Sequence, residues 1–359
     1  MARPFDATRL AFTGEPFVVA ANITHGEGTT GAAFDVSNDG TLIYSSPIPD
    51  TPATEAGSLT WAPKNGATPV RAGAGSLGRP TVGWWMLSPD GKRLAWADED
   101  IWVYDFRNEV AHRLPTEGHR DSNPVWSPDG LRLVVASSRT GRSELYIKAA
   151  DGSRPDQLLY SAEPGVVVAP FSWSKDLIVF TKTEDPAGAR DLWILPMTGS
   201  AQPFPYMKTP HDEYAAALSP DGRWLAYVSN EEKGGRNYEV FVQSFPDPLS
   251  GDKSKISKSG GWAPRWSRDL HELFYLTPEG RIVAVTVGTA PAFSPGRPIT
   301  LDIELGFPGA SNAVSGRAFP YDVSSDGLRF LIRGRGIAKE DFLAVTIKII
   351  SNWTANLKH

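Results

Sequence analysis

Three of the six histidines in this 359-residue chain share one sequence context. His25, His119 and His211 each lie 8 to 12 residues before the serine of a recurring Ser-x-Asp turn sequence. Neutral imidazoles and carboxylates are typical ligands of divalent metal sites that keep one position open for water. The carboxylates that stand beside these histidines are Glu27, Asp121, Asp212 and Glu213.

One hypothesis is therefore a metal or acid–base site assembled across repeats. Its metal ligands would be His25, His119 and His211, holding one divalent ion such as Zn, Mn or Ca. The metal would lower the pKa of a bound water and make a hydroxide that cleaves an ester, lactone or phosphotriester. A lyase would instead place the metal on a sugar carboxylate. The catalytic candidates are His119, His211, Asp121 and Glu213.

The alternative is that these are polar loop residues at a solvated channel mouth. No HExxH spacing places two histidines on one element. The nearest string to a GxSxG nucleophile motif is AGSLG at 74–78, which lacks the first glycine. The chain has no cysteine, which excludes disulfides, thiolate metal sites and a cysteine nucleophile. Whether the chain is an enzyme therefore stays open.

Equivalent segments of other repeats carry candidate ligand-binding residues. Arg79, Trp262 and Arg317 stand where the histidines stand elsewhere. Arg265, close to Trp262, adds a further cation. Arginines at a channel mouth could bind an anionic ligand, because a guanidinium pairs well with carboxylates and phosphates. The simpler interpretation is that each arginine is solvated.

The repeat itself is Ser-x-Asp-Gly or a close relative. Serine and aspartate side chains bond the local backbone, and glycine accepts a positive φ, so the sequence is typical of a tight turn. Two copies carry Leu177 and Leu270 in place of glycine, and we expect those turns to differ or to be strained. The seven copies begin at Ser37, Ser88, Ser127, Ser174, Ser219, Ser267 and Ser324.

Apolar β-type runs flank every copy, and no amphipathic helix competes with them. Four short antiparallel strands repeated every 40 to 50 residues predict an all-β fold, a β-propeller of four-stranded antiparallel blades. The strand that ends at Trp126 would be innermost. The 12 tryptophans would fill the space between blades.

Seven motifs predict seven blades, with six as the alternative. We expect one propeller domain over residues 1–359, in which residues 1–30 supply the closing strand and the lead-in to the first blade. An N-terminal strand that pairs with the last blade would close the ring and leave no long sheet edge.

Charge and hydropathy limit the classes of partner that the chain could bind. A net charge of −5 gives no basic footprint for nucleic acid. No run of 18 apolar residues predicts insertion into a membrane. The N-terminus, MARPFDATRLAF, lacks the apolar core of a signal peptide. We expect a monomer that binds a peptide, a protein or a small molecule.

The repeats resemble the WD40-like, or PD40, repeats of TolB-like β-propellers. The matching segments are NPVWSPDGLRLVVASSRTGRSELYIKAADG (123–152) and the stretch 219–285 that begins SPDGRWLAYVSNEE. The wider pattern is similar to the C-terminal propeller of bacterial membrane-anchored serine/threonine protein kinases. The resemblance implies a sensing or protein-interaction domain in an extracytoplasmic or periplasmic location. Some TolB-like propellers are metal-dependent pectate-type lyases, so the resemblance leaves the enzyme hypothesis open.

Overall fold

The protein is described by a computed structural model that divides into two compact units, residues 57–335 and residues 1–56 with 336–359. All of the regular secondary structure in the described residues is β-strand. No helix in the described part of the chain is long and apolar enough to cross a membrane. The structure describes residues 5–6, 11–12, 34–36, 42–47, 59–72, 84–97, 100–116, 119–184, 188–198, 202–232, 237–251, 253–290, 292–305, 319–333 and 345–350.

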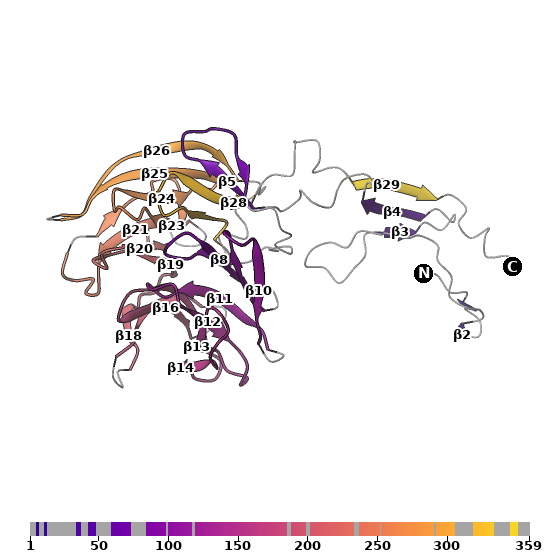
Figure 1. The fold of residues 1–359 in the computed structure, drawn as a ribbon, viewed down its shortest axis with the longest axis horizontal. Helices are drawn as coiled ribbons and strands as arrows, with labels where there is room; N and C mark the ends of the chain where they lie inside the picture. The colour runs from indigo at the N-terminus through magenta and orange to yellow at the C-terminus, as the bar shows by residue number, and fades with distance from the viewer. Residues whose placement is uncertain are drawn as a thin grey trace. The chain divides into compact units, whose positions relative to one another are not determined.

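The larger unit contains six four-stranded antiparallel sheets, the blades of a propeller (Figure 1). The innermost strands are β7 (Trp85–Leu87), β11 (Asp121–Trp126), β15 (Val167–Trp173), β19 (Glu213–Leu218), β23 (Trp262–Trp266) and β27 (Tyr321–Val323). Next outward lie β8 (Arg93–Ala97), β12 (Arg132–Ser137), β16 (Leu177–Thr183), β20 (Trp224–Ser229), β24 (Glu272–Leu276) and β28 (Arg329–Arg333).

The outer half of each blade is more polar at its edge. The third strands are β9 (Ile101–Asp105), β13 (Glu144–Ala149), β17 (Asp191–Pro196), β21 (Glu239–Ser244), β25 (Arg281–Gly288) and β5 (Leu59–Pro63). The outermost strands are β10 (Val110–Leu114), β14 (Gln157–Ser161), β18 (Phe204–Met207), β22 (Ser254–Lys255), β26 (Ser294–Glu304) and β6 (Val70–Arg71).

The ring closes through a blade built from both ends of the unit. β28 pairs antiparallel with β5, with Ile332 opposite Thr60. Innermost strands of successive blades contact one another around the ring, and β27 contacts β7. The expectation of seven blades was wrong, and the six-bladed alternative is confirmed. The closing strands come from residues 59–71, and of the proposed closing segment 1–30 only β1 (Phe5–Asp6) and β2 (Ala11–Phe12) are described, paired with each other.

The first Ser-x-Asp-Gly copy accounts for the difference in blade number. Ser37 lies outside the described residues, but its flanking strands β3 (Phe34–Val36) and β4 (Leu42–Pro47) pair with each other. β4 then pairs with β29 (Val345–Ile350) in a three-stranded sheet of the smaller unit. The motif specifies a hairpin turn and not the sheet that the hairpin joins. How far a propeller domain extends beyond residues 57–335 therefore stays a prediction.

The repeated turn owes its shape to local hydrogen bonds. In the turn at Ser127 the amide of Gly130 donates to the Ser127 carbonyl (2.8 Å), and the Arg132 amide donates to Ser127 Oγ (2.9 Å). The Leu131 amide donates to Asp129 Oδ1 (2.9 Å), and Gly130 has a φ of 68°. The Ser127 hydroxyl holds the pKa of the Asp129 carboxyl below its usual range. These side-chain bonds explain why the sequence predicts the turn reliably.

The two copies without glycine behave differently from each other. Leu270 adopts a φ of 63°, a left-handed conformation that costs about 1 kcal/mol for a residue with a Cβ. Leu177 instead begins β16, and its carbonyl accepts from the Ser174 amide at 2.8 Å, which makes a shorter turn. Strain at one copy and a different turn at the other are both outcomes that the sequence predicts.

Candidate ligand-binding site

The innermost strands of all six blades meet at one cavity of about 630 Å³, which we call the axial cavity. It opens where the innermost strands end and the Ser-x-Asp turns begin. Residues of the turns at Ser174 and Ser219 line its mouth, together with Pro89 and Pro128 of two further turns. A cavity with a contribution from every blade is typical of a propeller's ligand site.

Three indole rings lie in the cavity wall. Trp126, Trp173 and Trp266 each immediately precede a motif serine, and all three are buried. Trp126 Nε1 donates to the carbonyl of Met86 in the preceding blade (2.9 Å), and Trp266 Nε1 donates to that of Ala217 (2.9 Å). These bonds fix the rings and join neighbouring blades. The interpretation of tryptophans as inter-blade filler thus holds for Trp126 and Trp266, which in addition face a cavity.

A buried ion pair lies in the same wall. The Nε of Arg265 on β23 lies 3.3 Å from Asp322 Oδ1 on β27, with 8% and 11% of their side chains exposed. Asp322 also accepts main-chain N–H bonds from Leu87 (2.7 Å) and Val323 (2.9 Å). Burial lowers the pKa of Arg265, yet a guanidinium stays protonated in a protein. The pair therefore places a permanent cation beside the cavity.

Most of the hydrogen-bonding capacity of Arg265 is unused. Nη1 donates to the Pro264 carbonyl at 3.2 Å. Nε meets Asp322 only as an ion pair, and the buried Nη2 has no hydrogen-bond acceptor within the part of the chain that the structure describes. A buried donor without an acceptor costs about 1 to 3 kcal/mol, and more when it is charged.

Three aromatic rings pack together beside the cavity, and we call them the aromatic plug: Trp84, Phe171 and Phe319. The centroids of Trp84 and Phe319 are 4.3 Å apart, and all three side chains are buried. Because the rings come from three different blades and Phe171 lines the cavity, we place the plug on the axis. The Arg265 guanidinium lies 3.5 Å from the centre of the Phe319 ring, a close cation–π contact.

Bulges in three inner strands shape the approach to this wall. Asn123, Ala215 and Ala263 each lie four residues before a motif serine and have φ of 52° to 54°. The β-ladder register shifts at each of them. A bulge bends a strand and re-aims the side chains that follow it. Those side chains include Trp126 and the pair Arg265 and Trp266, which line the cavity.

The residues proposed from the sequence lie at the other end of the inner strands. Asp121 begins β11, whereas the cavity residues Val125 and Trp126 end it. Five residues of extended strand separate the two ends by roughly 15 Å. None of His119, Asp121, His211, Glu213 or Trp262 is among the residues that line the axial cavity.

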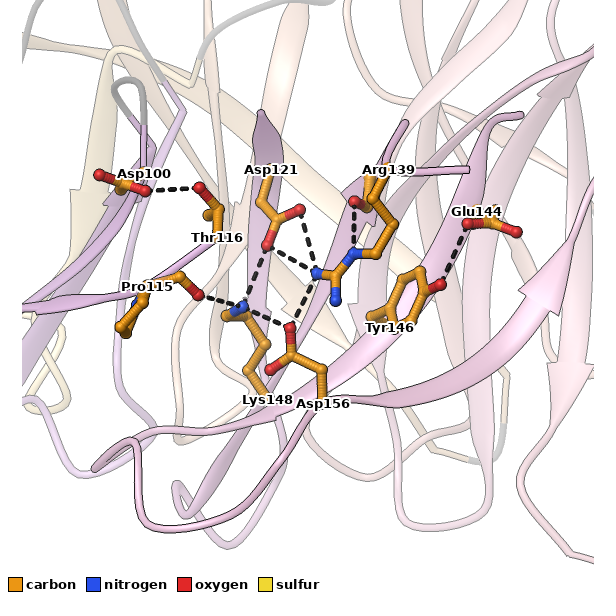
Figure 2. A network of polar contacts seen from close by, with 10 residues as sticks. Asp100, Pro115, Thr116, Asp121, Arg139, Glu144, Tyr146, Lys148 and Asp156 are labelled. Atoms are coloured by element: carbon orange, nitrogen blue, oxygen red, sulfur yellow. Dashed lines mark hydrogen bonds and ion pairs between the residues drawn. The ribbon is translucent and has the colours of Figure 1, made fainter. Parts of the chain in front are cut away.

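Asp121 belongs to a buried ionic network, shown in Figure 2. Lys148 Nζ donates to Asp121 (3.1 Å), to Asp156 (2.6 Å) and to the Pro115 carbonyl (3.1 Å). The Arg139 guanidinium bridges the same two carboxylates, at 3.2 Å and 2.8 Å. Two cations in contact with the Asp121 carboxylate pack it in place. This geometry favours a structural role for Asp121.

Glu213 occupies the corresponding place in β19, six residues before its motif serine. Its Oε1 accepts from Thr209 (2.7 Å) and Ser229 (3.3 Å), while its buried Oε2 has no partner in the described structure. Burial, and to a lesser degree the charges of Asp191 and Asp212, raise the pKa of Glu213 to about 7. A carboxyl group poised near neutrality can take up a proton, which fits a structural acid as well as a catalytic one.

The remaining candidates do not converge. His119 is exposed and His211 is half-buried, and Trp262 is buried. Asp212 forms an ion pair with Arg190 at 2.6 Å. Among the described residues no group of three or more histidine, aspartate or glutamate side chains is placed to hold a metal. His25, Arg79 and Arg317 lie outside the described residues, so a site that includes them stays a prediction.

The sequence carries a signal for the cavity residues. The tryptophans immediately before motif serines were expected to be filler, and Arg265 was expected to be a solvated cation or an anion ligand. Asp322, which is not among the residues proposed from the sequence, lies two residues before Ser324. Residues one and two positions before the motif serine recur in the cavity wall, and that register is the signal that could have located the site.

Six four-stranded blades, each with a Ser-x-Asp turn between its two inner strands, define a TolB-like β-propeller fold. In accordance with this, the structure of a putative TolB from Agrobacterium tumefaciens superposes with a TM-score of 0.56. It shares 14% sequence identity, and the match covers 78% of this chain and 98% of that one. At this identity the likeness shows the fold alone.

Sequence relatives carry little functional information. No family model matches the chain. An uncharacterized protein of Agrobacterium fabrum is 29% identical over 167 residues, which is 43% of this chain and 52% of that protein. An uncharacterized peptidase of Bacillus subtilis, YuxL, is 26% identical over 164 residues, 43% of this chain and 23% of its own length. This chain therefore spans about half of one relative and a quarter of the other.

Proposed function

We propose that this propeller is a binding module that accepts a segment of a peptide or partner protein in the axial cavity. The observation that supports the proposal is the convergence of six inner strands on one open cavity with three tryptophans in its wall. Ligand sites of about 300 to 1,000 Å³ with apolar walls and a few fixed polar groups are typical of proteins. Indole rings offer large contact area at small entropic cost, which suits peptide side chains.

The TolB-like fold adds support by analogy, because the resemblance implies an interaction domain. It also implies a location outside the cytoplasm, which we retain as part of the proposal. A monomeric state is proposed on the same basis. The cavity needs only one copy of the chain, since all six blades come from it.

Selection from a phage-displayed random heptapeptide library against the whole chain tests the proposal. Pro128 is exposed and lines the cavity, whereas Leu131, in the same turn, is 65% exposed and does not. Pro128→Trp should obstruct the mouth and weaken binding of the selected peptides at least tenfold. Leu131→Trp should bind them like the unmodified protein.

Thermal unfolding of both variants checks that the obstruction acts on binding and not on folding. Equal affinity for Pro128→Trp and the unmodified protein would place the peptide site elsewhere and overturn the proposal. The absence of any enriched peptide would overturn it as well.

A further inference from the structure

We infer that Arg265 binds a carboxylate group at the inner end of the axial cavity. This inference rests on the proposed function and names the chemistry that the bound peptide presents. It starts from Arg265, whose buried guanidinium has a donor with no hydrogen-bond acceptor in the described part of the protein. Arg265 is 93% buried, lines the cavity, and holds Nη2 without a hydrogen-bond acceptor there.

The immediate surroundings hold Arg265 in place without saturating it. The Phe319 ring packs against the guanidinium at 3.5 Å, and the Pro264 carbonyl takes only Nη1. Arg265 lines the cavity with 8% of its side chain exposed, while Nη2 itself is buried. A carboxylate entering along the indole walls would draw Nη2 toward it and form a charge-assisted hydrogen bond.

The carboxylates near Arg265 and Arg268 have main-chain partners of their own. Asp322 faces Arg265, but two main-chain N–H groups already stabilise that carboxylate. Arg268, exposed in the cavity wall, interacts electrostatically with the same Asp322 and with Asp90. Asp90 in turn accepts from Ser88 and from the Lys92 amide. Two guanidinium groups thus face two carboxylates, each of which also accepts at least one main-chain N–H bond.

A carboxylate can come from the C-terminus of a peptide or from an aspartate or glutamate side chain. The two sources present the same group to Arg265. They differ in the path of the peptide chain, because a C-terminal carboxylate ends the chain at the aromatic plug and a side-chain carboxylate lets the chain leave again. The test therefore uses probes of both kinds.

The first experiment follows the guanidinium signals of the unmodified, ¹⁵N-arginine-labelled protein. N-acetylglutamine carries only an α-carboxylate, N-acetylglutamic acid α-amide carries only a side-chain carboxylate, and N-acetylglutamine amide carries neither. We expect one or both acids, and not the neutral amide, to shift the signals of Arg265 at millimolar concentration. No shift with either acid would overturn the inference while leaving peptide binding by the cavity intact.

The second experiment assigns the effect to Arg265. Arg265→Gln alone strands Asp322, so the double variant Arg265→Gln/Asp322→Asn keeps the pair neutral and the fold testable by its melting transition. Its affinity for the effective acid should fall at least tenfold by calorimetry. Arg281→Gln, a variant of a surface arginine outside the cavity, should bind like the unmodified protein. Unchanged affinity in the double variant would overturn the inference.

Discussion

Lys148 Nζ lies 3.1 Å from Asp121 Oδ2, and 3% or less of either side chain is exposed. The pair joins the innermost strand of its blade to the third strand across β12. Removing the cation would leave Asp121 buried with only Arg139 as a partner. We expect Lys148→Met to lower the free energy of unfolding by about 3 kcal/mol in urea titration, at the lower end for a broken buried pair.

The matched control is Lys208→Met, because Lys208 pairs with Glu184 at 2.9 Å with about half of each side chain exposed. Water screens that pair, so its loss should leave the urea midpoint nearly unchanged. Similar losses in the two variants would show that the burial of the Asp121 network contributes nothing.

Glu213 makes stability depend on pH in the direction opposite to a salt-bridged acid. Its pKa is about 7 in the folded protein against 4.5 in the unfolded chain. The folded state thus favours the protonated form, and the contribution is complete below pH 4.5 and is lost as pH rises through 7. We expect Glu213→Gln to remove a decline on the order of 1–3 kcal/mol between pH 5 and pH 8. Urea titrations at both pH values measure it, and an unaltered decline in the variant would contradict the assignment.

Alanine substitutions at two motif glycines distinguish the effect of backbone strain from the effect of contact with a neighbouring blade. Gly130 and Gly222 have φ of 68° and 70°, so alanine at either position is strained by about 1 kcal/mol. A Cβ at Gly130 would lie 3.1 Å from Arg93 Nη2, whereas at Gly222 it would meet nothing within 4 Å. Arg93 also donates to the Gly130 carbonyl.

We therefore expect Gly130→Ala to lower the melting temperature more than Gly222→Ala. Equal shifts in melting temperature would mean that the Arg93 side chain moves away from the new Cβ at no measurable cost. An additional Arg93→Lys substitution should reduce the difference in melting temperature between the two alanine variants. Lysine has no Nη2 atom, so the close contact with the new Cβ at position 130 would be lost.

The histidines at the opposite end of the inner strands should be dispensable for peptide binding. His119 and His211 lie outside the axial cavity lining. The double variant His119→Ala/His211→Ala should bind selected heptapeptides with unchanged affinity. The prediction would be contradicted if the double variant lost peptide affinity. It would also be contradicted if elemental analysis found a metal ion in the unmodified protein and none in the double variant. Either result would place the ligand site at the histidine end of the inner strands.

Sequence reasoning succeeded where the determining bonds are local. The turn at Ser127 depends on contacts within five residues, and its Ser-x-Asp-Gly pattern predicts both the turn and the two strands that it joins. The same locality limits the blade count. The copy at Ser37 predicts a hairpin correctly, but the pairing of β4 with β29 depends on residues about 300 positions away.

The site could not be predicted to the same extent, because it depends on ring closure. Arg265 and Asp322 are 57 positions apart, and only the adjacency of β23 and β27 brings them together. The roles of Asp121 and Glu213 diverge for a similar reason. They share one repeat position, yet Lys148 and Arg139 face the first, while hydroxyl groups of Thr209 and Ser229 bond the second.

The blade shared by β5 and β28 has a consequence for synthesis on the ribosome. β5 emerges with the first blades, but its partner β28 is not translated until residue 329. During that interval the growing chain carries an unpaired edge at each end, of the kind that other strands can join. The nascent propeller therefore remains an open arc until its last inner hairpin, β27 and β28, has been synthesised.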